Sequence, residues 1–157
     1  NGLPLLLKTS PSGGCRHPTE GYVLLLSEGE YPMGWYHISG EPPRLEFIRP
    51  SKPGTDVVRR CFPNSVERCP SEIKAVLVIT SVFARNMYRY REPRTFRTVH
   101  LDAGHIAGTV EMLAEQYKLG TFVQYTMNEE SVAKELDINL MEEGPMATIS
   151  FYNRLES

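Results

Sequence analysis

The segment 10–18, which reads SPSGGCRHP, restricts the local backbone more than any other part of this chain. Its two glycines lack a Cβ, so they can take φ > 0 or let a ligand approach the backbone closely. Its two prolines fix their own φ angles, so we expect a rigid loop before the strand that begins near Tyr22. Ser12 and Arg16 would direct hydrogen-bond donors at one small volume. These residue types leave two alternatives open, a ligand-binding loop and an ordinary tight connection.

Length and composition indicate one soluble domain. We expect residues 1–157 to form a single domain with a modest core, and 41% hydrophobic with 23% charged residues is typical of a globular protein. The net charge of −2 gives no general attraction to nucleic acid or to anionic membranes. No apolar run approaches the roughly 20 residues of a membrane span. The chain begins with Asn1, not Met, which we interpret as a processed, trimmed or partial product.

The cysteines point to a reduced protein. There are three, an odd number, at positions 15, 61 and 69, and their spacing fits no zinc site. Together with the absence of a signal peptide pattern, this favours a cytoplasmic location and no bound metal.

Short apolar runs predict the strands. Residues 22–26 (YVLLL) form a continuous apolar run, which predicts a strand buried on both faces. Residues 35–38 and 45–48 predict two short strands around the turn signal at 40–43. Residues 75–80 (AVLVIT) predict the central core strand.

The strongest helix pattern covers residues 103–118. Asp102 is a natural N-cap, and Gly120 follows just past the end. The apolar positions at spacings of three and four, which predict the core face, are Ile106, Val110, Leu113 and Tyr117. A second face carries the small residues Ala103, Gly104, Ala107 and Gly108. That face could form a dimer seam or pack closely within the chain.

The remaining segments complete an α+β pattern. Residues 51–70 lack periodicity, so we expect an irregular connection that can include a short helix and is a candidate lid. Residues 121–127 predict a strand, Asn128 caps a helix that ends at Leu136, and residues 147–152 predict a last strand. The order of strands and helices predicts an α+β fold.

Several blocks in a fixed order resemble one known family. They are SPSGG, a strand ending in Thr80-Ser81, the RNMYRY block at 85–90, LDAGH at 101–105 and LGT at 119–121. In this order they resemble the C-terminal portion of the SagB-type dehydrogenases, the azoline-oxidising branch of the FMN-dependent nitroreductase family. The resemblance implies a nitroreductase-like fold with a mixed or antiparallel sheet flanked by helices, a dimer, and FMN as cofactor. The family's N-terminal FMN-phosphate motif has no counterpart before Ser10.

The resemblance also implies the site residues. Azoline oxidases of the family carry a Lys-Tyr pair where this chain has Arg89-Tyr90, which makes these two the expected catalytic residues. Arg89 stays protonated at ordinary pH, so Tyr90 is the group left to transfer a proton. The expected cofactor-binding residues are Pro11, Ser12, Gly13, Gly14, Arg16, Gly120, Thr121, Gln124, Tyr125 and Arg154.

Two features of this region carry open alternatives. The segment 85–97 holds five arginines, two tyrosines and a phenylalanine, which suits an anionic ligand but also a solvated, charged connection. In LDAGH, we expect Asp102 to act as a structural N-cap. His105 would either face the site or bond a buried carbonyl.

The expected activity is oxidation of a thiazoline or oxazoline ring, in a ribosomal or carrier-bound peptide, to the aromatic azole. The alternative is a catalytically silent scaffold that pairs with an active flavoprotein. Both imply a homodimer or a heterodimer with another nitroreductase-like chain, and neither requires nucleic acid or a membrane. A nicotinamide-driven reductase fits the SPSGG and LDAGH blocks less well.

Overall fold

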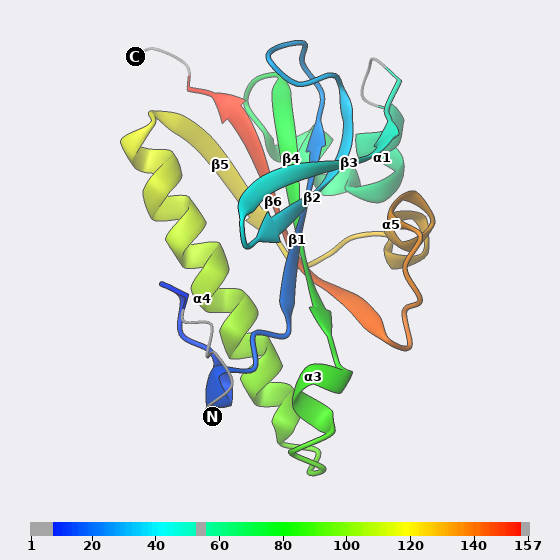
Figure 1. Ribbon diagram of the computed structural model, residues 1–157. Helices are drawn as coiled ribbons and strands as arrows, with labels where there is room; N and C mark the ends of the chain where they lie inside the picture. Colours follow the sequence, from blue (N-terminus) through cyan, green and yellow to red (C-terminus); the bar gives the residue numbers. More distant parts are fainter. Residues whose placement is uncertain (1–7, 53–55, 155–157) are drawn as a thin grey trace.

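In the described part of the chain, six strands form one sheet in the order β3-β2-β1-β4-β6-β5, and each neighbouring pair is antiparallel. The computed structural model describes residues 8–52 and 56–154. Helix α4 lies on one face of the sheet, while α1 and α5 lie on the other (Figure 1). This arrangement confirms the predicted α+β class with an antiparallel sheet.

The strands are β1 (Thr19–Leu25), β2 (Gly34–Gly40), β3 (Pro43–Pro50), β4 (Ile73–Val82), β5 (Leu119–Gln124) and β6 (Glu143–Asn153). The helices are the short 3₁₀ turn η1 (Gly13–Cys15), α1 (Asp56–Cys61), α2 (Pro63–Arg68), α3 (Ala84–Met87), α4 (Thr95–Gln116) and α5 (Glu129–Leu136). Every predicted strand is present, although β6 is longer than expected and β5 ends at Gln124, before the predicted limit.

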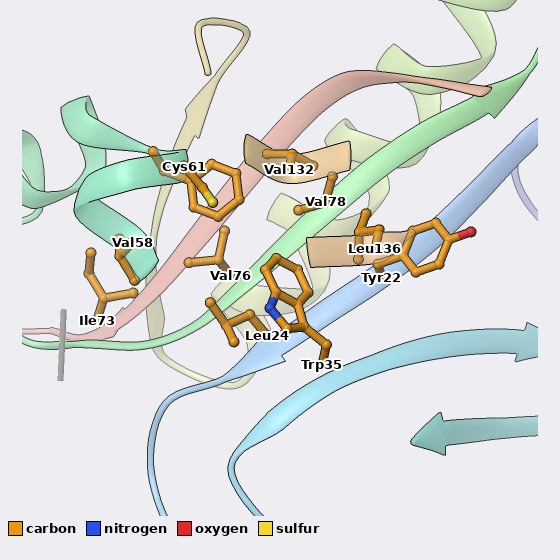
Figure 2. Packing of buried hydrophobic residues seen from close by; sticks show 11 residues of the cluster. Tyr22, Leu24, Trp35, Val58, Cys61, Ile73, Val76, Val78, Val132 and Leu136 are labelled. Carbon is orange, nitrogen blue, oxygen red and sulfur yellow. The ribbon is translucent and has the colours of Figure 1, made fainter. Parts of the chain in front are cut away.

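Strand β4 is central because both of its faces are buried. Val76 and Val78 point into one hydrophobic cluster, built with residues of α1, α2 and α5 (Figure 2). Leu77 and Ile79 point into a second cluster on the α4 face. A strand covered on both faces is apolar at consecutive positions, which accounts for the run at 75–80.

Strand β1 corrects the expectation of burial on both faces. Tyr22 and Leu24 are buried in the first cluster, but Val23 and Leu25 on the opposite face are only half-buried. Helix α4 packs chiefly on β4, β5 and β6 and only marginally on β1. The apolar run at residues 22–26 therefore predicted more burial on the α4 side of β1 than the structure shows.

Residues 51–70 are not an irregular lid. Apart from residues 53–55, which lie outside the described part, this segment contains α1 and α2. Val58, Cys61 and Phe62 are fully buried, and the Phe62 ring centroid lies 6.5 Å from that of Trp35. Burial raises the pKa of the Cys61 thiol to about 11. The segment supplies part of the core and cannot open without exposing it.

Helix α4 begins earlier than predicted, at Thr95, with Pro93 just before its N-cap. The prediction of Asp102 as the N-cap is wrong, because the helix begins seven residues earlier, with Arg94 at the N-cap position. Asp102 instead lies inside the helix and is buried.

The core face of α4 also differs from the predicted one. The side chains buried against the sheet are mainly small, namely Val99, Ala103, Ala107 and Ala114. Ile106 and Val110 pack at the edge of that cluster, whereas Leu113 and Tyr117 are exposed. Small residues let the helix approach the sheet closely, so helix spacing alone selected the wrong residues at its C-terminal end.

Helix α5 confirms its prediction closely. The side chain of Asn128 accepts a hydrogen bond from the backbone N–H of Ser131, and the helix ends at Leu136. Among the described helices, none has both the length and the apolar character needed to cross a membrane.

Phe62→Ala should lower the free energy of unfolding by about 3–5 kcal/mol, because it leaves a cavity between α2 and the sheet. Chemical denaturation followed by circular dichroism measures the loss. Met141→Ala is the control, since that side chain is 86% exposed and its removal should change stability by less than about 0.5 kcal/mol. Similar losses in both variants would contradict a core role for Phe62, the residue between α1 and α2.

Candidate functional site

A buried carboxylate in α4 holds the glycine-rich loop. Ser12 Oγ donates to Asp102 Oδ2 at 2.7 Å, and the Gly13 N–H donates to Oδ1 at 3.1 Å and to Oδ2 at 3.3 Å. The His17 N–H donates to Ser12 Oγ at 2.9 Å, which closes the loop on itself. Since Asp102 is only 4% exposed, these donors supply the hydrogen bonds that its carboxylate oxygens would otherwise make to water. The loop and the helix are therefore one hydrogen-bonded unit.

The two glycines of the loop are required by close contacts. A Cβ on Gly13 would overlap the methyl group of Thr98 in α4. Gly14 has φ of 64°, and a Cβ there would lie 2.6 Å from the Tyr90 hydroxyl oxygen. The structure thus places the Tyr90 hydroxyl directly against the loop backbone, so two of the predicted blocks meet.

A cleft of about 410 Å³ lies between this loop and the segment that joins α3 to α4. It is lined by Gly13, Gly14, Arg89, Tyr90, Arg91, Glu92, Arg94, Thr95, Arg97 and Thr98. Glu92 was missed by the sequence analysis, although it lies two residues from Tyr90. Its carboxylate pairs with Arg94.

Arg16 points elsewhere. Its guanidinium donates to the Tyr88 hydroxyl and lies 5.1 Å from the centroid of that ring. Arg16 borders a second hollow, on the β1–β2 side of the loop. Pro11 is exposed at the start of the loop. Neither residue lines the cleft that contains Tyr90.

Most of the other predicted cofactor residues lie in or just after β5, the strand that follows α4. Gly120 is in β5, where a Cβ would overlap the ring of Tyr152, so a packing reason accounts for this glycine. Gln124 is buried and donates to Ser65 Oγ at 2.5 Å, which places its side chain in the core. Tyr125 follows the strand and is 71% exposed. Thr121 follows Gly120 in β5, the edge strand, and is half-buried.

Arg154 is held by an ion pair. Its guanidinium donates to both carboxylate oxygens of Glu115, near the end of α4, with the Nη1–Oε1 distance at 3.0 Å. This contact lowers the pKa of Glu115. A phosphate at Arg154 would have to compete with that carboxylate.

The predicted residues therefore form two groups, one beside the N-terminal half of α4 and one on β5, which begins at the C-terminal end of α4 and runs back along the sheet (Figure 1). The helix between Asp102 and Gln116 is about 21 Å long at 1.5 Å per residue. The first group contains the loop with Arg89 and Tyr90, and the second contains β5 with Arg154. His105, between them, lies on the exposed side of α4.

A charged network connects the loop to the sheet. Arg85 donates to the His17 carbonyl oxygen at 3.0 Å and pairs with Glu20. His37 Nε2 lies 2.9 Å from Glu20, and its Nδ1 lies 3.2 Å from Glu46. Carboxylates only accept hydrogen bonds, so both ring nitrogens must carry protons and His37 is cationic here. Burial lowers the pKa of His37, but the hydrogen bonds to Glu20 and Glu46 outweigh it and raise the pKa overall.

This network predicts a pH-dependent stability. Because the folded-state pKa of His37 is raised, its stabilisation is fully present below its unfolded pKa of about 6.5. It is lost as the pH rises through the folded-state value. The free energy of unfolding, measured by urea denaturation at several pH values, should fall over that window and fall less in His37→Gln. Parallel profiles for the two proteins would contradict the assignment.

Asp102→Asn should release the loop. The Asn amide group must face one of the two donors that now bond the carboxylate, so at least one bond to a charged acceptor is lost, at about 1.5–3 kcal/mol. Hydrogen exchange should show faster exchange at the Gly13 amide. Glu111→Gln, on the exposed side of the same helix, is the matched control. An unchanged Gly13 rate in Asp102→Asn would disprove the anchoring role.

Comparisons with known proteins were made for sequence and for structure. The sequence model of the nitroreductase family matches residues 65–151, more than half of the chain. The chain is 29% identical over 143 residues to the trifolitoxin-processing protein TfxB of Rhizobium leguminosarum bv. trifolii, which covers 90% of this chain and 38% of TfxB.

Two solved structures have the same fold. A putative nitroreductase from Anabaena variabilis superposes with a TM-score of 0.85 and 25% identity, over 97% of this chain and 30% of that chain. The E. coli microcin synthetase McbBCD complex with truncated pro-MccB17 bound superposes with a TM-score of 0.77 and 22% identity, over 95% of this chain and 56% of that chain.

The chain thus spans well under half the length of TfxB and of the Anabaena protein. These matches confirm the family that the ordered motifs resembled. The chain belongs to the nitroreductase family, whose members bind FMN.

Proposed function

We propose that this chain is an FMN-dependent oxidoreductase domain that oxidises a thiazoline or oxazoline ring in a peptide to the azole. The observation that carries the proposal is the contact between the Tyr90 hydroxyl and the backbone of Gly14 at one cleft. It is supported by the similarity to TfxB, named as a trifolitoxin-processing protein, and to the McbBCD complex, solved with truncated pro-MccB17.

The residues of this chain fit FMN as two half-sites. Strand β5 is an edge strand that pairs only with β6 among the described residues, so its outer N–H and C=O groups are available to the polar edge of a flavin ring. The SPSGG loop offers a rigid wall beside the N-terminal half of α4. The loop packs against α4 at Asp102, whereas β5 begins only after the last turn of that helix, so we infer that the two walls of one chain serve different rings.

A second chain would bring the half-sites together. The exposed side of α4 carries Leu101, Gly104, Gly108 and Met112, and a Cβ built on either glycine meets no atom within 4 Å. Two such faces packed antiparallel would place the loop of one protomer near β5 of its partner. This is the dimer, with itself or with a similar chain, that the family resemblance implies.

The cleft holds two candidate groups for the proton transfer, Tyr90, which would have to act as its phenolate, and the Glu92 carboxylate. Azole formation removes a hydride and a proton from neighbouring ring atoms. A bound flavin supplies the two-electron acceptor for the hydride. Arg89 is permanently protonated and can orient the substrate but cannot act as the base. Tyr90 is 41% exposed beside the loop and is our candidate for the base, with Glu92 as the competitor.

One observation favours the rival function, a silent scaffold subunit. Glu115 occupies both guanidinium nitrogens of Arg154 that a flavin phosphate would use. In that case the chain would dimerise with an active flavoprotein and hold no FMN itself.

Tyr90→Phe should lower turnover of a thiazoline-containing peptide by at least about 100-fold, the usual contribution of general base catalysis, and leave FMN binding unchanged. Mass spectrometry of the peptide, which loses two hydrogens on oxidation, measures turnover, and visible absorbance measures FMN. Glu92→Gln is the matched comparison and should retain activity. Full activity in Tyr90→Phe with loss in Glu92→Gln would transfer the role to Glu92.

A further inference from the structure

The cleft beside the glycine-rich loop has an unusual charge for this protein. Four arginines and one glutamate line it, whereas the whole chain carries a net charge of −2. Glu92 pairs with Arg94. Within the described residues, Arg89, Arg91 and Arg97 form no ion pair, so three positive charges remain to attract an anion.

The position of these charges opposes helix stability. Arg94 is the N-cap of α4 and Arg97 lies in its first turn, which contains no acidic residue. The N-terminal end of a helix dipole is positive, so cations there are unfavourable. Sequences that break a local rule of this kind often do so at functional sites. The cations therefore need a reason beyond folding.

The backbone of this helix end is already satisfied. The N–H groups of Thr95, Phe96 and Arg97 donate to the carbonyl oxygens three residues earlier, at 2.9 to 3.2 Å. A phosphate-binding helix end presents free N–H groups converging on one compact anion, and this one does not. Only the guanidinium groups remain as donors, and they are spread around a cleft of about 410 Å³. Planar guanidinium forks at separate positions match separate carboxylates.

We propose that this cleft binds an acidic segment of a peptide, with Arg91 and Arg97 receiving carboxylate side chains. The inference rests on the proposed function, which gives the chain a peptide substrate, and it names the substrate class. Tyr90 lines the same cleft as Arg91 and Arg97, so a peptide bound by these two arginines would lie beside the tyrosine hydroxyl. Carboxylate side chains of the peptide on either side of its azoline ring would then position that ring relative to Tyr90.

The test compares two short fluorescent peptides by polarisation, at low and at high salt. One has Asp and Glu on both sides of a Ser-Cys pair, and the other has Asn and Gln there. The acidic peptide should bind at least about tenfold more tightly at low salt, and salt should remove the difference. Arg91→Gln with Arg97→Gln should lose that preference.

The matched control is Arg59→Gln with Arg68→Gln, the same charge change in α1 and α2, which should bind like the unchanged chain. Removing Arg97 from the helix start should not destabilise the fold, and thermal unfolding checks this. Equal binding of both peptides would overturn the proposal, as would unaltered acidic-peptide binding by the Arg91 and Arg97 variant. FMN or inorganic phosphate that displaces the peptide at similar concentration would also overturn it. Acidic-peptide binding, together with no turnover of a thiazoline-containing peptide by the chain supplied with FMN, would disprove the proposed oxidation but not this site.

Discussion

The hydrogen bonds that Asp102 accepts determine how the candidate site is built. A carboxylate inside a helix and only 4% exposed is unfavourable unless donors surround it, and here Ser12 and the Gly13 N–H supply them. The same hydrogen bonds hold the loop, so the buried carboxylate and the shape of the loop depend on each other. That shape brings the backbone of Gly14 against Tyr90. The loop side of the cleft therefore depends on this one anchor.

Helix α4 has three separate roles along its length. Its first turn supplies arginines to the cleft, its small buried residues pack on the sheet, and its end carries Glu115, which pairs with Arg154. The remaining side of the helix is exposed and contains glycines with open space around them. A helix that separates two half-sites and leaves its own outer face uncovered is suited to pairing with a second copy. Helix α4 connects the two proposals. A dimer formed through it would complete the flavin site, and the arginine cleft at its N-terminal end would bind the peptide substrate.

The sequence predicted the strands well because apolar runs and turn residues are local signals. It was also right about Asn128, whose cap bond involves only neighbouring residues. It was wrong about Asp102, since a helix N-cap and a buried anchor for a distant loop have the same local pattern, and the contact spans 90 positions in sequence. It was wrong about a lid at residues 51–70, because six-residue helices are too short to show the periodicity that would have indicated their buried faces. The contact of Gly14 with Tyr90 and the burial of Gln124 beside Ser65 both join distant parts of the sequence, so no local pattern indicates either one.

The central claim is that one flavin site is shared by two chains paired through α4. Sedimentation velocity of the chain mixed with FMN, followed by the visible absorbance of the flavin, tests it most directly. We expect the flavin to sediment with a dimer, and Gly108→Arg to be a folded monomer without flavin, because that position is open within one chain. Flavin sedimenting with a monomer, or a Gly108→Arg variant that still forms a flavin-bound dimer, would contradict the claim.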